Sequence, residues 1–332
     1  MRYLIAGRYL LAVFVCTLLA SAWAGCNPQS DVTVVKLGHG LDPVHPVHQG
    51  MEFMAEKVVE KSGGKMRVDI YPSQQLGSER ELLELLQLGS LGMTKVTAAV
   101  LESFAPSFKA FSVPYLFRDR DHHFRVLEGE IGKELLLASQ AYWLRGLAYY
   151  DAGSRSFYTK EKPIHSPADL AGLKIRTLES KTQVDMVNTM GGAATPISWG
   201  ELYTALQQGV VDGAENNPPS LYTSRQYEVC KYYTLDEHTT IPDVLLISTI
   251  VWEALTPQEQ TWLQEAADES AQYQKVLWQE ASDAALVALE ENGIEIIRPD
   301  KTPFAESVAP IYESFKSEPA VYDIIQRIRA TE

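Results

Sequence analysis

The chain has 332 residues, of which 45% are hydrophobic and 22% are charged, and this length suits two globular domains of about 150 residues each. The composition excludes a disordered, collagen-like or disulfide-dense protein. The formal net charge is −14, from 29 basic and 43 acidic residues. A nucleic-acid partner is therefore not expected, because phosphate backbones bind clustered Lys and Arg.

Residues 1–25 have the pattern of a secretory signal peptide. A short basic segment ends at Arg8, a continuous apolar run covers residues 9–20, and small residues lead to Ala24. This order predicts export and cleavage after Ala24. The apolar run is shorter than the about 20 residues that a membrane-spanning helix needs. We therefore expect a periplasmic protein.

The three cysteines leave a second interpretation of this region open. Cys26 follows Ala24-Gly25, as the acylated cysteine of a bacterial lipoprotein does, although Trp23 departs from the aliphatic residue usual in that motif. The protein is thus either cleaved after Ala24 or lipid-anchored through Cys26. Only Cys230 falls within the folded body, so no internal disulfide is expected there. Its apolar neighbours predict a buried, inert thiol.

The hydrophobic pattern of the remaining chain alternates between strand and helix periods. Strands are expected over residues 32–37 and 66–71, and helices over 48–61 and 79–88, the latter capped by Ser78. Further alternating elements cover residues 146–150, 173–176, 182–190, 200–208 and 244–251. This alternation predicts an α/β fold with largely parallel sheets and with ligands at the carboxyl ends of strands.

The C-terminal third begins with a long predicted helix. Thr256 and Pro257 form a typical helix start, and the helical pattern continues through Glu291, before Asn292-Gly293. About 35 residues at 1.5 Å each give a length of about 50 Å, which is more than the width of one domain. The helix should therefore cross two domains.

The sequence contains no strong catalytic motif. His45 and His48 form an H-x-x-H pair near His39, but turn and cap histidines are commoner than metal ligands. His122 and His123 lie in a charged stretch that predicts a solvated helix start. No nucleophile elbow, phosphate-binding loop or dinucleotide motif occurs. We therefore expect a protein that is not an enzyme and has no cofactor.

Three polar residues stand out at predicted strand ends. Arg155, Arg176 and Asn216 each lie where an α/β fold places its ligand. Guanidinium groups match the geometry of a carboxylate or a phosphate. The alternative is that each Arg pairs with one of the many acidic residues of the chain.

Several segments resemble one family. They are residues 71–77 (YPSQQLG), 172–176 (GLKIR) and above all 201–216 (ELYTALQQGVVDGAEN). These motifs resemble those of the substrate-binding proteins of TRAP (tripartite ATP-independent periplasmic) transporters, and the resemblance covers residues 32 to about 327. It implies a two-lobed periplasmic-binding-protein fold with hinge strands, in which the long C-terminal helix spans both lobes. It also implies a monomer that binds an organic acid and delivers it to membrane permease subunits.

The resemblance further implies lobe boundaries and site residues. Lobe 1 would comprise residues 31–152 and 242–281, and lobe 2 residues 153–241 and 282–332. The implied ligand-binding residues are Arg176 as the carboxylate clamp, Arg155 as a second basic group, Asn216 as a donor, Trp199 as an aromatic wall, Glu79, Glu179 and Asp243 at the distal part of the ligand, and His48 and Arg80 near the wall of lobe 1.

The expected ligand is a hexuronate such as glucuronate or galacturonate. The acidic side chains Glu79, Glu179 and Asp243 can accept hydrogen bonds from sugar hydroxyls but should repel the second charge of a dicarboxylate. The motif at residues 214–220 (AENNPPS) also resembles the uronate-binding branch. The alternatives are another organic acid (a dicarboxylate or sialic acid type), a sensor that signals to a membrane kinase, or a secreted enzyme with Glu79 and Asp243 as acid and base.

Overall fold

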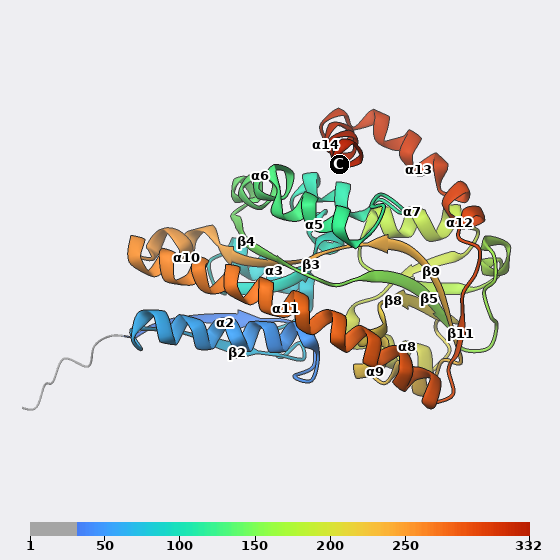
Figure 1. Cartoon of the computed structure of the whole chain (residues 1–332), viewed down its shortest axis with the longest axis horizontal. Helices are drawn as coiled ribbons and strands as arrows, with labels where there is room; N and C mark the ends of the chain where they lie inside the picture. The colour runs from blue at the N-terminus through green and yellow to red at the C-terminus, as the bar shows by residue number, and fades with distance from the viewer. Residues whose placement is uncertain (1–31) are drawn as a thin grey trace, which may run out of the picture. The chain divides into compact units, whose positions relative to one another are not determined.

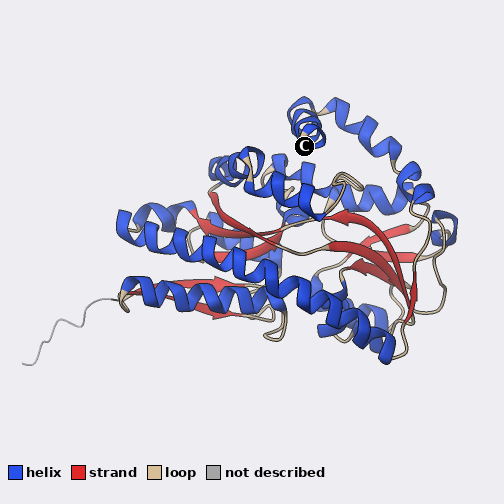
Figure 2. Cartoon of the chain, viewed as in Figure 1, coloured by secondary structure: helices blue, strands red, loops and turns tan. Residues whose placement is uncertain are grey.

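Two β-sheets and the helices that cover them make up residues 32–332, which are the residues that this computed structural model describes (Figures 1 and 2). The predicted signal peptide and Cys26 lie outside the described residues. None of the described helices is long and apolar enough to span a membrane.

The first sheet has the strand order β2-β1-β3-β10-β4. Strands β1 and β3 run parallel, whereas β10 is antiparallel to both β3 and β4. The strands are β1 (Thr33–Gly38), β2 (Met66–Tyr71), β3 (Met93–Thr97), β4 (Leu144–Tyr150) and β10 (Asp243–Ser248).

The second sheet has the order β11-β9-β5-β8-β6-β7. Strand β5 is antiparallel to β8 and β9, whereas β6 runs parallel to β7 and β8. The strands are β5 (Ser154–Thr159), β6 (Lys174–Thr177), β7 (Ala193–Pro196), β8 (Gly213–Asn216), β9 (Tyr232–Thr240) and β11 (Glu295–Ile297).

The expectation of largely parallel sheets was therefore wrong, because both sheets are mixed. The chain passes from the first sheet to the second between β4 and β5, and returns between β9 and β10, through short extended connections. Parallel neighbours need a long crossover, usually a helix, which these short connections do not provide. The hinge strands of the predicted fold are these two passages.

The helices predicted from periodicity are present, with ends that differ by one or two residues. Ser78 caps α3 through a reciprocal capping box with Glu81. The α-helices are α2 (Pro46–Ser62), α3 (Glu79–Gln87), α4 (Ala98–Leu101), α5 (Arg120–Glu128), α6 (Glu130–Ala138), α7 (Lys181–Thr189), α8 (Trp199–Gln207), α9 (Pro218–Thr223), α10 (Thr249–Ala254), α11 (Pro257–Glu291), α12 (Thr302–Ser307), α13 (Ala309–Ser314) and α14 (Pro319–Ala330).

Helix α11 confirms the predicted long helix. Thr256 caps it, with Glu259 completing the capping box, and it extends for 35 residues to Glu291. It packs along α2 and against β4 of the first sheet and then continues to α9 beside the second sheet (Figure 1). Such a helix joins the two halves mechanically, since it is long enough to contact both.

Three apolar clusters hold these layers together. One lies between the first sheet, α2 and α11, and another between the second sheet, α8 and α9. The largest lies on the other side of the first sheet and continues through α7 to α12, α13 and α14. Helix α14 packs against α6 and the 3₁₀ helix Pro106–Ser112. The lobe boundaries themselves stay a prediction.

The predicted exposure of His122 and His123 was wrong, whereas the predicted burial of Cys230 is confirmed. His122 and His123 are buried rather than solvated, because α14 covers the start of α5: His122 Nε2 bonds to the carbonyl oxygen of Ile328 at 2.9 Å. His123 packs edge-on against Phe117. Cys230 is free and buried, and burial raises the pKa of its thiol to about 12.

Candidate functional site

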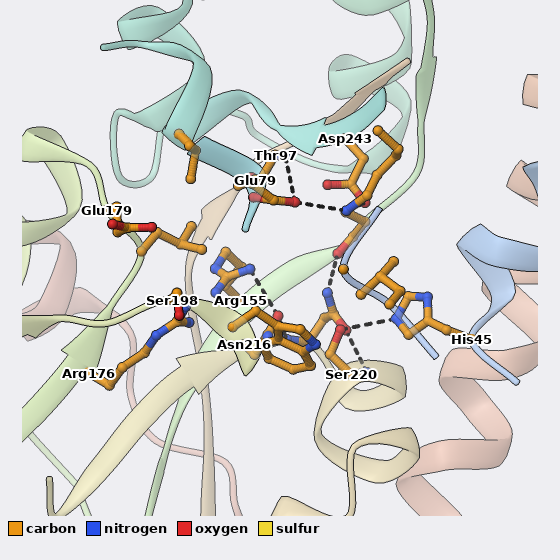
Figure 3. Close-up of a pocket in the computed structure, with 18 residues that line it drawn as sticks. His45, Glu79, Thr97, Arg155, Arg176, Glu179, Ser198, Asn216, Ser220 and Asp243 are labelled. Carbon is orange, nitrogen blue, oxygen red and sulfur yellow. Dashed lines mark hydrogen bonds and ion pairs between the residues drawn. The ribbon is translucent and has the colours of Figure 1, made fainter. Parts of the chain in front are cut away.

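A pocket between the two sheets collects most of the residues that the sequence singled out (Figure 3). The first-sheet side of the chain contributes side chains from α3, β3 and β10, and the second-sheet side contributes them from β5, β6 and β8. The predicted site residues that line it are Arg176, Arg155, Asn216, Trp199, Glu79, Glu179 and Asp243.

Arg176 is the cation of the pocket that lacks a carboxylate partner. It lies on β6 and is only 1% exposed, and its Nε donates to the carbonyl oxygen of Ile197 at 2.8 Å. Its Nη1 is buried and has no hydrogen-bond partner among the described residues. Burial lowers the pKa of Arg176, and nearby Glu215 only partly offsets this. A buried guanidinium without a carboxylate partner gains stability when it binds an anion, because an unpaired buried charge is costly.

Arg155 is held in a different way, by Glu215. Its Nε and Nη2 donate to the two carboxylate oxygens of Glu215 at 2.5 and 2.9 Å. Its Nη1 donates to Asn216 Oδ1 at 2.9 Å. Burial opposes the charge of Arg155, but Glu215 outweighs it and raises the pKa of Arg155. The alternative interpretation, that each arginine pairs with an acidic residue, therefore holds for Arg155 and not for Arg176.

Glu215 belongs to a larger buried network of alternating charges. His238 Nε2 lies 3.5 Å from Glu215 Oε2, and His238 Nδ1 lies 2.8 Å from Asp236 Oδ2. Burial alone would favour neutral forms, but Asp236 and Glu215 raise the pKa of His238 to about 9, and Arg155 together with His238 lowers that of Glu215 to about 2. Two cations and two anions of this network thus balance, and Arg176 stands outside it with no ion-pair partner among the described residues.

The opposite wall is built around Lys95, which the sequence analysis did not include. Lys95 Nζ lies 3.1 Å from Glu79 Oε1 and 3.2 Å from Asp243 Oδ2 (Figure 3 shows both carboxylates). Glu79 Oε1 also accepts a bond from the backbone N–H of Thr97. Burial opposes the charge of Lys95, but the two carboxylates raise its pKa, so the ammonium is charged.

Lys95 corrects the predicted acidic wall. Glu79 and Asp243 are both present as expected, but one cation lies between them, so this cluster carries a single net negative charge when all three groups are ionised. Burial raises the pKa of Glu79, against the opposing effect of Lys95. The wall thus offers carboxylate acceptors together with an ammonium donor. This wall therefore repels a second carboxylate less strongly than the sequence predicts.

Trp199, Asn216 and Glu179 complete the predicted set. Trp199 begins α8. Asn216 ends β8, and its Oδ1 accepts bonds from Arg155 and from the backbone N–H of Asn217. Its amide nitrogen is therefore the part of the side chain left to donate to a ligand. Glu179 lies between β6 and α7 at another edge of the pocket (Figure 3).

His48 and Arg80 are not among the residues that line the pocket. His48 is buried in α2, where its Nδ1 lies 2.9 Å from His39 Nε2. Arg80 points to the surface and pairs with Glu84. The neighbouring His45 does line the pocket: it caps α2 and bonds to Ser220 Oγ at 3.1 Å, which links the two sides.

Two signals in the sequence could have revealed the missed residues. Lys95 stands in the β-branched stretch MTKVT, which favours a buried strand, and a buried lysine is almost always paired. Glu215 stands next to Asn216 in the strongest motif of the chain. No sequence signal connects His238 to either. Among residues 32–332 no group of three His, Cys, Asp or Glu side chains could hold a metal ion.

Comparisons with known proteins agree with this architecture. The model of the family described as bacterial extracellular solute-binding protein, family 7, matches residues 37–318. The solved structure of a TRAP periplasmic solute-binding protein from Xanthobacter autotrophicus Py2 with bound β-D-galacturonate is 37% identical, with a TM-score of 0.87, over 90% of this chain and 100% of that chain.

Two further relatives are described with other ligands. A TRAP periplasmic solute-binding protein from Roseobacter denitrificans, solved with bound β-D-glucuronate, is 35% identical with a TM-score of 0.87, over 90% of this chain and 100% of that chain. The C4-dicarboxylate-binding periplasmic protein DctP of Rhodobacter capsulatus is 31% identical over 92% of this chain and 93% of its own length.

Two sheets joined by extended crossings, with a charged pocket between them, define a protein that binds a solute between two walls. The chain belongs to the bacterial extracellular solute-binding protein family 7, which confirms the resemblance to TRAP solute-binding proteins seen in its motifs.

Proposed function

We propose that this protein captures a hexuronate such as glucuronate or galacturonate outside the cytoplasm and delivers it to the membrane permease of a TRAP transporter. The observation that carries the proposal is Arg176, a buried guanidinium in the pocket with an unpartnered Nη1. Its Nε is occupied by Ile197, so its terminal nitrogens are the groups left to hold a carboxylate. Arg155 and Asn216 would contribute from the same wall.

The strength of these contacts is sufficient for physiological binding. A hydrogen bond to a charged group contributes about 1.5–3 kcal/mol. A micromolar site needs about 8 kcal/mol in total. Two or three such bonds to one carboxylate, together with contacts to the rest of the ligand, reach that range. No covalent chemistry is required of the pocket.

The remaining groups suit a sugar acid. Carboxylates accept hydrogen bonds from hydroxyl groups, and an ammonium group donates them. Glu79, Lys95 and Asp243 therefore present a mixed set that can bind several hydroxyls. Trp199 offers an apolar surface for the C–H face of a sugar ring. The uronates bound to two structural relatives support this choice.

A dicarboxylate is the competing ligand, because Lys95 could receive a second carboxylate and one relative is described as binding C4-dicarboxylates. Competitive binding of glucuronate, galacturonate, succinate, malate and sialic acid to the purified protein separates these possibilities. We expect one of the uronates to bind most tightly. Succinate or malate binding more tightly than both uronates would overturn the proposal, and so would strong binding of neutral glucose.

We also propose that the protein performs no turnover. Glu79 and Asp243, the acid and base of the enzyme alternative, both pair with Lys95 in the structure. Incubation of saturating uronate with the pure protein should return the ligand unchanged. Steady release of a product, in proportion to protein concentration, would favour the enzyme instead.

Ligand capture is expected to draw the two walls together by bending at the β4–β5 and β9–β10 passages. A smaller radius of gyration in small-angle scattering with saturating uronate would agree with this movement, and an identical radius would contradict it.

We also propose that the N-terminal signal exports the protein, with or without acylation of Cys26.

A further inference from the structure

The turn that follows β2 lies beside the pocket and contacts the opposite wall. The side chain of Gln74 approaches Gly200 so closely that a Cβ added to that glycine would lie 2.2 Å from Gln74 Oε1. A Cβ added to Gly40 would lie 3.4 Å from Gln74 Cγ and 3.7 Å from Trp199 Cδ1. Gly40 and Trp199 both line the pocket. The side chain of Gln74 therefore lies between Gly40 on the first-sheet wall and Gly200 at the start of α8 on the second-sheet wall.

The turn that presents Gln74 is rigid and strained. Ser73 and Gln74 both have left-handed backbone angles, with φ of 53° and 58°. Non-glycine residues keep such angles only where the surroundings hold them. Here the Ser73 N–H donates to the Leu41 carbonyl, the Gln74 N–H donates to the His39 carbonyl, and Ser73 Oγ donates to Asp42.

Gly200 has no backbone reason to be a glycine. It lies in the first turn of α8 and does not have a positive φ, and glycine is an unfavourable residue inside a helix. The space for a side chain is instead taken by the amide of Gln74. Gly200 therefore serves as a socket for that amide.

The amide nitrogen of Gln74 is buried and has no hydrogen-bond partner among the described residues. Buried donors are rarely left in this state, so its position calls for an explanation. We propose that Gln74 is a clasp between the two walls, which fits over Gly200 when they close and slows the release of the ligand. The inference rests on the proposed function for the identity of the ligand, but not for the contact itself.

The test compares Gln74→Ala, Gly200→Ala and the double variant by stopped-flow binding of D-glucuronate. Gln74→Ala should raise the dissociation rate by about 3- to 10-fold, because the packing of its side chain against Gly200 is lost, with little change in the association rate. Gly200→Ala should also raise the dissociation rate, because the methyl group of the new alanine would clash with the side-chain amide of Gln74. In the double variant the methyl group has room, so the two effects should not add.

Gln75→Ala is the matched control, because Gln75 is the exposed neighbour in the same turn. Its dissociation rate should equal that of the wild type. An unchanged dissociation rate in Gln74→Ala would overturn the clasp, as would fully additive effects of the two substitutions.

Failure of the proposed function would look different. A wild-type protein that binds neither D-glucuronate nor D-galacturonate would refute the ligand assignment. The clasp is then judged from the thermal unfolding of the four ligand-free proteins. A smaller loss of melting temperature from Gly200→Ala in the Gln74→Ala background than in the wild type supports the contact, whereas equal losses overturn it.

Discussion

The two walls of the pocket use the same kinds of charged residues in different ways. On the second-sheet wall, Arg155, Glu215, His238 and Asp236 form a buried chain in which positive and negative charges alternate and balance. On the first-sheet wall, Lys95 serves two carboxylates, so a negative charge is left over. The second-sheet chain is balanced within itself, whereas the first-sheet cluster is not, and Arg176 on the second-sheet wall stands outside the balanced chain.

This difference shows that the charge of a residue does not by itself decide whether it binds a ligand. Arg155 and Arg176 lie in the same pocket and both are buried, yet Glu215 occupies two nitrogens of Arg155 and no carboxylate of residues 32–332 is within bonding distance of Arg176. Glu215 fixes the paired guanidinium in place, so Arg155 has less capacity left for a ligand than Arg176 has. The unpaired one keeps its capacity for an incoming carboxylate. Four experiments test this contrast.

The largest effect is expected from Glu215→Gln, which breaks the balanced wall. It leaves the cations Arg155 and His238 without their shared anion in a buried site. Removal of one partner from a buried ion pair destabilises a protein by about 3–5 kcal/mol. Denaturant unfolding measures the effect, with the exposed Glu295→Gln as the control, for which we expect no measurable change. A loss below about 1 kcal/mol would mean that the network is not a stabilising unit.

The pH dependence of stability should reveal the same network. The pKa of His238 rises from its ordinary 6.5 to about 9 in the folded protein. The contribution of His238 to the free energy of unfolding is therefore complete below pH 6.5 and is lost as the pH rises to about 9. The slope approaches 1.4 kcal/mol per pH unit, for a total of at most about 3 kcal/mol.

In His238→Gln this alkaline loss should disappear, as measured by unfolding at a series of pH values. The acid side serves as the internal control. Burial lowers the pKa of His39 to about 2 and that of His45 to about 3, so both proteins should lose stability as the pH falls below 6.5. An alkaline slope that persists in the variant would assign it to another group.

The unpaired guanidinium is tested by Arg176→Lys. The substitution keeps the positive charge and removes the two-pronged geometry that matches a carboxylate. Affinity for D-glucuronate should fall at least tenfold, which corresponds to about 1.4 kcal/mol. Calorimetry on the folded variant measures it. Affinity equal to that of the wild type would refute the role of Arg176 as the clamp.

The smallest effect concerns selectivity at the first-sheet wall. Lys95→Met removes the cation between Glu79 and Asp243, which makes this wall more negative. The ratio of glucuronate affinity to succinate affinity should rise severalfold, by less than about 1.4 kcal/mol. A ratio that falls would show that Lys95 itself holds the hydroxyl groups of the sugar acid.

Much of the fold could be predicted because its signals are local. Ser78 and Thr256 are residues that favour helix starts, and the apolar spacing up to Glu291 defines α11 without any tertiary information. The direction of the strands was not predictable in this way. Whether β5 and β10 run parallel or antiparallel to their neighbours depends on how the chain crosses between the sheets, and hydrophobic alternation is the same in both cases.

The sequence by itself determined several of the helices, α11 among them, the family and seven of the side chains that line the pocket, since each of these rests on short patterns of residues. Tertiary structure alone decided which charges are paired. Lys95 meets Asp243 across 148 positions of the chain, and Arg155 meets Glu215 across 60. Ion pairing depends on distances of a few ångströms in three dimensions, and the linear sequence contains no measure of those distances.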